Sequence, residues 1–234
     1  METISGVDGC SWGWLAVTKE LPTGRIAWSV HTSTESLFAE HQTAKVIAID
    51  IPIGLPERGA RMCDLKARQL LGAQRGEAIF AAPTRPELST DDTHAAGGTG
   101  EKAQGGKRSW HALRVFKRVM QVDAILRRVP ALRERVHEIH PEVSFFFLGG
   151  GRPTRHSKET PVGRSERESL LAAAFGRAVT DALTVCYYTQ TTADDVFDAF
   201  AALWTAERIH KKKHLTLPPA PPLDTAGLPM EIVA

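Results

Sequence analysis

The sequence TISGVDGCSWGWLAVTK, at residues 3–19, decides the fold that we expect for this chain. Thr3–Asp8 and Trp12–Lys19 are short, largely apolar runs, and each predicts a β-strand. Turn residues follow at 22–24, and the alternating run Arg25–His31 predicts a third strand. We therefore expect the chain to begin with three successive strands joined by tight turns.

Helices and strands are expected to alternate after this meander. Ser33 or Thr34 is a suitable N-cap for a short helix, and Lys45–Ile51 is a Val- and Ile-rich strand that stops at Pro52. Later apolar patterns predict a helix over 109–129, a strand over 136–140 and a helix over 192–209. This order predicts an α/β fold in which helices flank a mixed sheet.

Basic residues concentrate in the middle of the chain. The formal net charge is +2, but residues 58–135 hold 16 Lys and Arg against 8 Asp and Glu. A basic middle within an acidic frame favours a surface for an anionic partner. The alternative is a basic helical face that is only solvated. We predict that residues 56–130 form a helical basic insertion, or cap, between two strands.

Composition excludes several classes of protein. Hydrophobic residues make up 42% and charged residues 24%, which is typical of a globular protein, and no apolar run approaches the roughly 18–20 residues of a membrane span. The first residues lack the basic and apolar regions of a secretory signal. The three cysteines are widely spaced and match neither a disulfide framework nor a zinc motif, so we expect a cytoplasmic protein that does not contact membranes.

Two aspartates stand at the ends of predicted strands. Asp8 precedes Gly9 at the end of the first strand, and Asp50 lies in the apolar run Ile49-Asp-Ile-Pro52. A carboxylate among buried aliphatic residues is costly unless it is paired, hydrogen-bonded or bound to a metal. Structural alternatives are an Asx-turn at Asp8 and a carboxylate at Asp50 that accepts hydrogen bonds from the following turn.

Three further acids are candidates. Asp195 fits a capping signature with Thr192, and that role alone explains it. Asp198 lies deeper in the same helix among apolar neighbours, which capping does not explain. Glu142 follows the last predicted strand of the sheet, in His140-Pro-Glu, where a strand-terminating turn is the alternative.

Carboxylates from two strand ends and one helix can converge on a single point. Mg²⁺ and Mn²⁺ prefer oxygen ligands and retain water molecules for a substrate. A pair of such ions about 3.5–4 Å apart can activate water and stabilise the leaving oxygen in phosphodiester cleavage. The acids therefore indicate a site for divalent cations.

Several short strings, in a fixed order, resemble a known family. They are Gly6-Val-Asp-Gly-Cys10, Ile49-Asp-Ile-Pro-Ile-Gly-Leu-Pro56, Arg61-x-Cys63-Asp64-x-x-Ala67-Arg68, Phe80-Ala-Ala-Pro83-Thr-Arg85, His140-Pro-Glu142 and Asp194-Asp-Val-Phe-Asp-Ala-Phe-Ala-Ala-Leu203. Together they resemble the family of predicted nucleases with an RNase H-like fold, and they extend over nearly the whole chain.

The resemblance implies an RNase H-like core: three antiparallel strands followed by helix, strand, helix, strand and helix, as one domain over residues 1–234. In such folds one catalytic aspartate lies on the first strand, which corresponds to Asp8, and a second acid ends the fourth strand, which corresponds to Asp50. Asp195-x-x-Asp198-Ala resembles the DxxDA pattern of RuvC-like resolvases.

Basic residues of the insertion are candidates for binding phosphates of DNA or RNA. They are Arg61, Arg68, Arg75, Arg85 and Lys117, with Arg114 and Arg118 beside the last of these on the long helix. For each of them the alternative is a solvated face or an ion pair between helices.

We therefore hypothesise a metal-dependent nuclease, a hydrolase of DNA or RNA that uses Mg²⁺ or Mn²⁺. Its catalytic residues would be Asp8, Asp50, Asp195, Asp198 and Glu142, with the metal held by Asp8, Asp50 and Asp198. One alternative is an ATP-binding phosphotransferase of the sugar-kinase or actin-like type, although Gly6-Val-Asp-Gly9 is the one glycine-rich turn near the first strand. The other alternative is a non-catalytic nucleic-acid-binding module.

Overall fold

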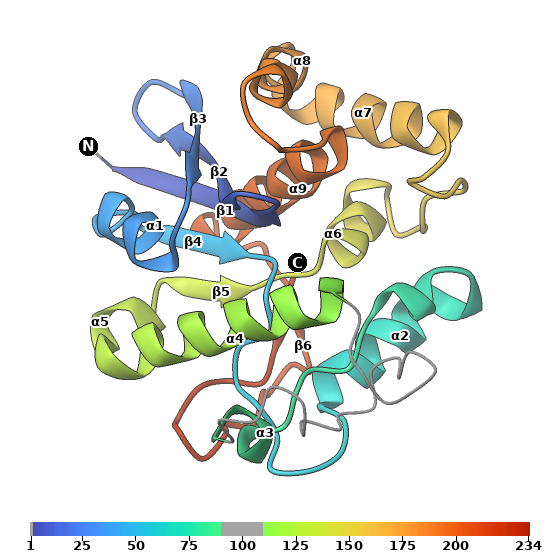
Figure 1. The fold of residues 1–234 in the computed structure, drawn as a ribbon. Helices are drawn as coiled ribbons and strands as arrows, with labels where there is room; N and C mark the ends of the chain where they lie inside the picture. Colours follow the sequence, from blue (N-terminus) through green and yellow to red (C-terminus); the bar gives the residue numbers. More distant parts are fainter. Residues whose placement is uncertain (1, 90–109) are drawn as a thin grey trace.

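The computed structural model describes residues 2–89 and 110–234 of the chain. Its helices and strands, shown in Figure 1, follow the order β1 (Thr3–Cys10), β2 (Gly13–Glu20), β3 (Ile26–His31), α1 (Thr34–Glu40), β4 (Val46–Ile49), α2 (Met62–Arg75), η1 (Gly76–Ala78), α3 (Arg85–Ser89), α4 (Trp110–Arg128), α5 (Pro130–Arg133), β5 (Val136–Glu138), α6 (Pro141–Leu148), α7 (Pro161–Phe175), α8 (Ala178–Ala182), η2 (Leu183–Tyr187), α9 (Ala193–His210), β6 (Thr216–Leu217) and β7 (Ile232–Val233).

The main sheet has five strands in the order β3-β2-β1-β4-β5. β1 and β3 pair with β2 in antiparallel fashion, whereas β4 pairs with β1, and β5 with β4, in parallel. The mixed sheet predicted from the sequence is confirmed, and its arrangement is consistent with an RNase H-like fold. β1 lies at the centre and is hydrogen-bonded along both edges to neighbouring strands.

Alternation along β1 directs its side chains into two separate cores. Ile4 and Cys10 pack with the apolar face of α9, and Val7 packs on the other side with residues of α1 and α4. Figure 1 shows α1 and α4 on one side of the sheet and α9 on the other. Asp8 is in phase with Ile4 and Cys10, and it therefore faces α9.

α9 crosses the sheet at unusually close range. A Cβ atom added to Gly6 would lie 2.0 Å from the backbone nitrogen of Leu203 and 2.3 Å from the carbonyl oxygen of Ala199. Small residues on α9 allow this approach, because Ala199, Ala201 and Ala202 are fully buried beside β1. The absence of a side chain at Gly6 thus sets the position of α9 over the central strand.

The segment 56–130 lies between β4 and β5, as predicted, and its described part is mainly helical. α2, η1, α3 and α4 belong to it, while residues 90–109 lie outside the described residues. Near the C-terminal end of the chain, β7 pairs with β6 in a separate two-stranded sheet.

No single helix in the described part of the chain is long and apolar enough to cross a membrane. The pair formed by α7 and Ala178–Tyr187 reaches the required length only when joined, and it is bent by 117°.

Gly6→Ala is expected to destabilise the protein severely. Its methyl group would meet the backbone of α9, which has no flexible side chain to give way, so the free energy of unfolding should fall by about 3 kcal/mol or more. Gly59→Ala is the matched control: its Cβ meets nothing within 4 Å, and its φ of +74° costs only about 1–2 kcal/mol. Urea unfolding followed by circular dichroism measures both, and equal losses in the two variants would contradict the packing argument.

Candidate active site

Asp8 and Asp50 meet because parallel strands end at the same edge of the sheet. Val7 pairs with Ile49 in the β1–β4 register, and the backbone nitrogen of Asp50 donates to the carbonyl of Val7 at 3.0 Å. The residue after each paired position is an aspartate. The register therefore carries both carboxylates to one end of the sheet.

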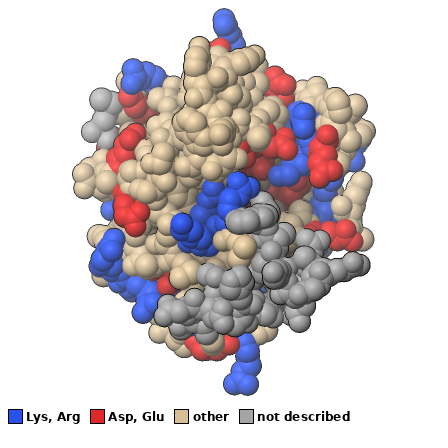
Figure 2. Space-filling model, in the orientation of Figure 1, with Lys and Arg blue, Asp and Glu red and all other residues tan. Residues whose placement is uncertain are grey.

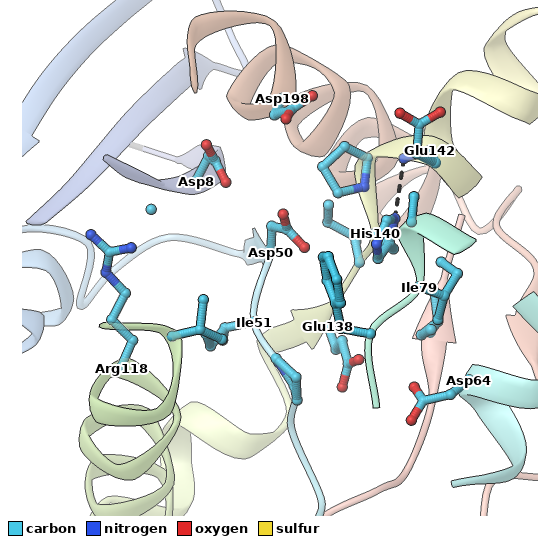
Figure 3. Close-up of a pocket in the computed structure, with 18 of the residues that line it drawn as sticks. Asp8, Asp50, Ile51, Asp64, Ile79, Arg118, Glu138, His140, Glu142 and Asp198 are labelled. Carbon is cyan, nitrogen blue, oxygen red and sulfur yellow. Dashed lines mark hydrogen bonds between the residues drawn. The ribbon is translucent and has the colours of Figure 1, made fainter. Parts of the chain in front are cut away.

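Asp198 reaches the same place from α9. It lies one residue before Ala199, whose carbonyl approaches Gly6, so the helix position fixed by Gly6 also fixes Asp198. Asp8 and Asp198 are each 7% exposed. All three aspartates line a pocket of about 380 Å³, and Figure 3 shows them around it on separate elements.

The remaining predicted acids also line this pocket, as do several other polar residues. Glu142 lies in the first turn of α6 and Asp195 in the first turn of α9. Other polar lining residues are Arg61, Asp64, Arg118, Glu138, His140, Lys158 and Asp194. The pocket is thus predominantly acidic at the sheet end and α9.

Burial raises the pKa of all three central aspartates. The pKa of Asp50 rises to about 8, first through burial and then through the nearby charge of Asp198. Burial also raises the pKa of Asp8 well above its usual value, and the charges of Asp50 and Asp198 add to this. For Asp198 burial again has the largest effect, and Lys158 opposes it. Burial in this pocket therefore disfavours full ionisation of the three carboxyl groups at neutral pH.

Lys158 is a residue of this pocket that the sequence did not suggest. Its Nζ lies 3.1 Å from Oδ2 of Asp198, and the charge of Asp198 raises the pKa of Lys158 further. It belongs to the irregular segment between α6 and α7, where no periodic pattern or motif marks it. Its ammonium group stays charged at neutral pH and neutralises part of the aspartate cluster.

Two of the predicted catalytic acids, Asp195 and Glu142, already form a structural hydrogen bond or ion pair. Asp195 completes a capping box, in which its Oδ2 accepts from the Thr192 nitrogen at 2.7 Å. Glu142 accepts from Nη2 of Arg167, a side chain only 1% exposed. Both acids border the pocket, but capping and ion pairing account for them as structural groups.

His140 is a further polar group in the pocket that the motif containing Glu142 included without a role. Its Nδ1 accepts from the backbone nitrogen of Glu142 at 3.2 Å, which caps α6. Burial lowers the pKa of His140 to about 4, so the ring is neutral at pH 7.

The three central aspartates do not form a closed coordination shell in this structure. Among the described residues, the one group with ligand atoms of three side chains all within 4.8 Å of one another is His31, Glu40 and His41. This second group lies outside the pocket and could hold a metal ion. In the pocket, the side chains of Asp50 and Asp8 are hydrogen-bonded to each other, whereas Asp198 accepts from Lys158.

A family model described as "Protein of unknown function (DUF429)" matches residues 6–223. The chain belongs to this family. The matched range includes Asp8, Asp50 and Asp198, together with Lys158. No curated protein and no solved structure matches the chain significantly.

In this DUF429 chain, two arginines predicted to bind phosphates have structural partners instead. Arg61 is 3% exposed and forms ion pairs with Glu138 and Asp64, each at 2.6 Å. Arg85 is paired with Asp123 at 2.6 Å and also with Asp224. A count of charged residues does not identify the partners with which they form ion pairs. For Arg61, the position of Asp64 three residues later was the feature of the sequence that could have indicated the local ion pair.

The other basic residues that were predicted to bind phosphates differ in their exposure and in their hydrogen bonds. Arg68 donates to the carbonyl of Ile79, and Arg75 to the carbonyl of Thr154, so both are tied to the backbone. Lys117 is exposed on α4. Arg118 lines the pocket, donates to the carbonyls of Cys10 and Gly13, and lies over the Trp14 ring at 5.3 Å. Figure 2 shows basic side chains gathered near α4 on this face, with acidic side chains toward α6 and α9.

The aspartate cluster should make the metal-free protein less stable as pH rises. The pKa of Asp50 is about 8 in the folded protein against 3.8 ordinarily, so the folded state binds the extra proton between these values. Stability is present at the acidic end of this range and is lost toward pH 8. Asp50→Asn should reduce the loss of stability between pH 5 and pH 8. Asp181→Asn, at an exposed position of α8, should leave this loss unchanged. Melting temperatures in EDTA from about pH 5 to 8 test this, and an unaltered slope in Asp50→Asn would refute it.

Proposed function

We propose that this protein is a metal-dependent nuclease that hydrolyses phosphodiester bonds of DNA or RNA with Mg²⁺ or Mn²⁺. The observation that carries the proposal is the convergence of Asp8, Asp50 and Asp198 on one pocket, where burial raises the pKa of all three carboxyl groups. Such a cluster is destabilising by itself and favourable once a divalent cation is bound.

The donor set fits a hard divalent cation. Asp8 and Asp50 offer carboxylate oxygens from adjacent strand ends, and hard cations prefer such ligands. The acids that are already neutralised by arginine, Glu138 and Glu142, are not needed as ligands. Asp8, Asp50 and Asp198 remain, with Lys158 as the nearest cation on Asp198. We assign metal binding to these three aspartates.

The chain's own residues would divide the work as follows. Asp8, Asp50 and Asp198 hold the cation, and a bound Mg²⁺ or Mn²⁺ supplies an activated water and stabilises the leaving oxygen. Lys158 keeps a positive charge beside Asp198, where it can balance a phosphate that enters the pocket. Arg118 contributes a second positive charge on the wall formed by α4.

Two features at the edge of the pocket suit a nucleic acid. Lys117 is exposed next to Arg118 on α4 and is able to contact phosphates outside the pocket. Phe80 lines the pocket with 64% of its surface exposed, although a large apolar side chain is normally buried. A ring at that position offers a stacking surface for an unpaired base.

Asp8→Asn is the decisive test of this function. The purified chain with Mn²⁺ should cleave labelled single-stranded DNA, double-stranded DNA or RNA, and Asp8→Asn should reduce the rate by about 100-fold or more, because one metal ligand loses its charge. The control Asp181→Asn makes the same chemical change on α8, outside the pocket, and should retain wild-type activity.

Three results would refute the assignment. If Asp8→Asn still cleaves nucleic acid, the proposed metal site is not responsible for the cleavage. Saturable ATP binding with phosphate transfer would establish the phosphotransferase alternative instead. Tight nucleic-acid binding that EDTA does not affect, with no turnover, would identify a binding module. Circular dichroism of Asp8→Asn distinguishes each of these from loss of the fold.

Lys158→Met should increase the affinity of the pocket for Mn²⁺. The ammonium group competes with a cation for Asp198, and a partly exposed ion pair of this kind corresponds to an effect of about two- to fivefold. Lys213→Met, at an exposed position shortly after the end of α9, is the control with the same loss of charge. Calorimetric titration with Mn²⁺ measures both variants, and weaker binding by Lys158→Met than by the control would show that Lys158 does not compete.

A further inference from the structure

A second group of metal-ligating side chains lies on the other face of the sheet from the aspartate pocket. His31 ends β3, and Glu40 and His41 end α1. His31 pairs with Trp14, which packs in the core beneath α1, whereas Asp8 faces α9. One potential ligand atom from each of the three side chains lies within 4.8 Å of the other two. None of the three lines the pocket.

In each imidazole, one ring nitrogen is hydrogen-bonded to a serine hydroxyl, and the other ring nitrogen is not. Ser29 Oγ lies 2.9 Å from Nε2 of His31, and Ser5 Oγ lies 3.1 Å from Nδ1 of His41. The nitrogens that remain are Nδ1 of His31, 3.8 Å from Oε2 of Glu40, and Nε2 of His41. Metal-binding histidines commonly use one nitrogen for the ion while a hydrogen bond at the other orients the ring.

The remaining nitrogen of His41 is the most telling atom of the group. His41 is 5% exposed, and its Nε2 is buried without a hydrogen-bond partner among the described residues. Buried polar atoms normally have a partner, so an orphaned nitrogen indicates a ligand that completes its environment.

The donor chemistry selects a class of ion. Two imidazoles and one carboxylate suit Zn²⁺ and similar transition ions, whereas Mg²⁺ takes oxygen ligands. Around one tetrahedral Zn²⁺, with bonds of about 2.0–2.2 Å, ligand atoms lie about 3.3–3.6 Å apart. The three ligand atoms here lie within 4.8 Å of one another, and the side chain of Glu40, which is 59% exposed, is able to move toward the two rings.

We propose that His31, Glu40 and His41 bind a Zn²⁺-like transition ion that fastens the end of α1 to the edge strand β3. Ser29 and Ser5 orient the two rings, and Ser5 extends the link to the central strand β1. The ion has a structural role on the face of α1, and the site works independently of the aspartate pocket.

Zn²⁺ titration of the full chain tests this site directly. After treatment with EDTA and dialysis, calorimetric titration with Zn²⁺ is carried out in excess Mg²⁺, which occupies oxygen ligands. We expect one Zn²⁺ per chain and a rise in melting temperature. Co²⁺ in place of Zn²⁺ should give the visible absorption of a nitrogen-ligated ion of low coordination number.

Glu40→Gln is the informative variant, because this exposed side chain can change without unfolding the protein. It should weaken Zn²⁺ binding by about tenfold or more. Glu35→Gln removes the same charge at another exposed position of α1, and this variant should bind Zn²⁺ as the wild type does. His31→Gln provides a second variant that removes a nitrogen ligand.

The proposal is overturned if no stoichiometric Zn²⁺ binding occurs, in which case the histidines are an ordinary buried pair. It is equally overturned if Glu40→Gln and His31→Gln bind as tightly as Glu35→Gln. Loss of Zn²⁺ binding in Asp8→Asn would instead assign the ion to the aspartate pocket.

Discussion

The contact between α9 and β1 at Gly6 is the constraint on which the rest of the structure depends. Because no Cβ separates the two backbones, the helix lies directly on the central strand, and Asp198 comes within reach of Asp8. The parallel register of β1 and β4 then adds Asp50. Three residues that are distant in sequence thus share one pocket because of the backbone geometry.

The carboxylates of this pocket differ in the positive charges that surround them. Glu138 and Glu142 have buried arginine partners, which stabilise the junction of β5 with α2 and the junction of α6 with α7. Asp8, Asp50 and Asp198 instead lie around the ammonium group of Lys158, which bonds to Asp198. Unbalanced negative charge that the fold itself does not need is a feature of functional sites. This contrast is why the three aspartates, rather than all five predicted acids, carry the proposed chemistry.

Much of the fold could be predicted because its signals are local. The meander, the strand over 45–51 and the helix over 192–209 each follow from periodicity, and an acid directly after an apolar strand drew attention to Asp8 and Asp50. Lys158 escaped prediction because an irregular segment carries no pattern. The role of Arg61 was misjudged because charge counts do not identify ion-pair partners. His31 and His41 went unnoticed since only the docking of α1 on the sheet brings them together.

The central place of β1 has a consequence for how the chain matures during translation. Asp8 emerges from the ribosome early, whereas Asp198 follows 190 residues later. β1 cannot bury both faces until α9 has been synthesised, so its hydrophobic residues stay exposed for most of elongation, which favours a slow folder dependent on non-local contacts. The aspartate cluster is completed only at the end of that process, and a partly made chain therefore lacks the cation pocket.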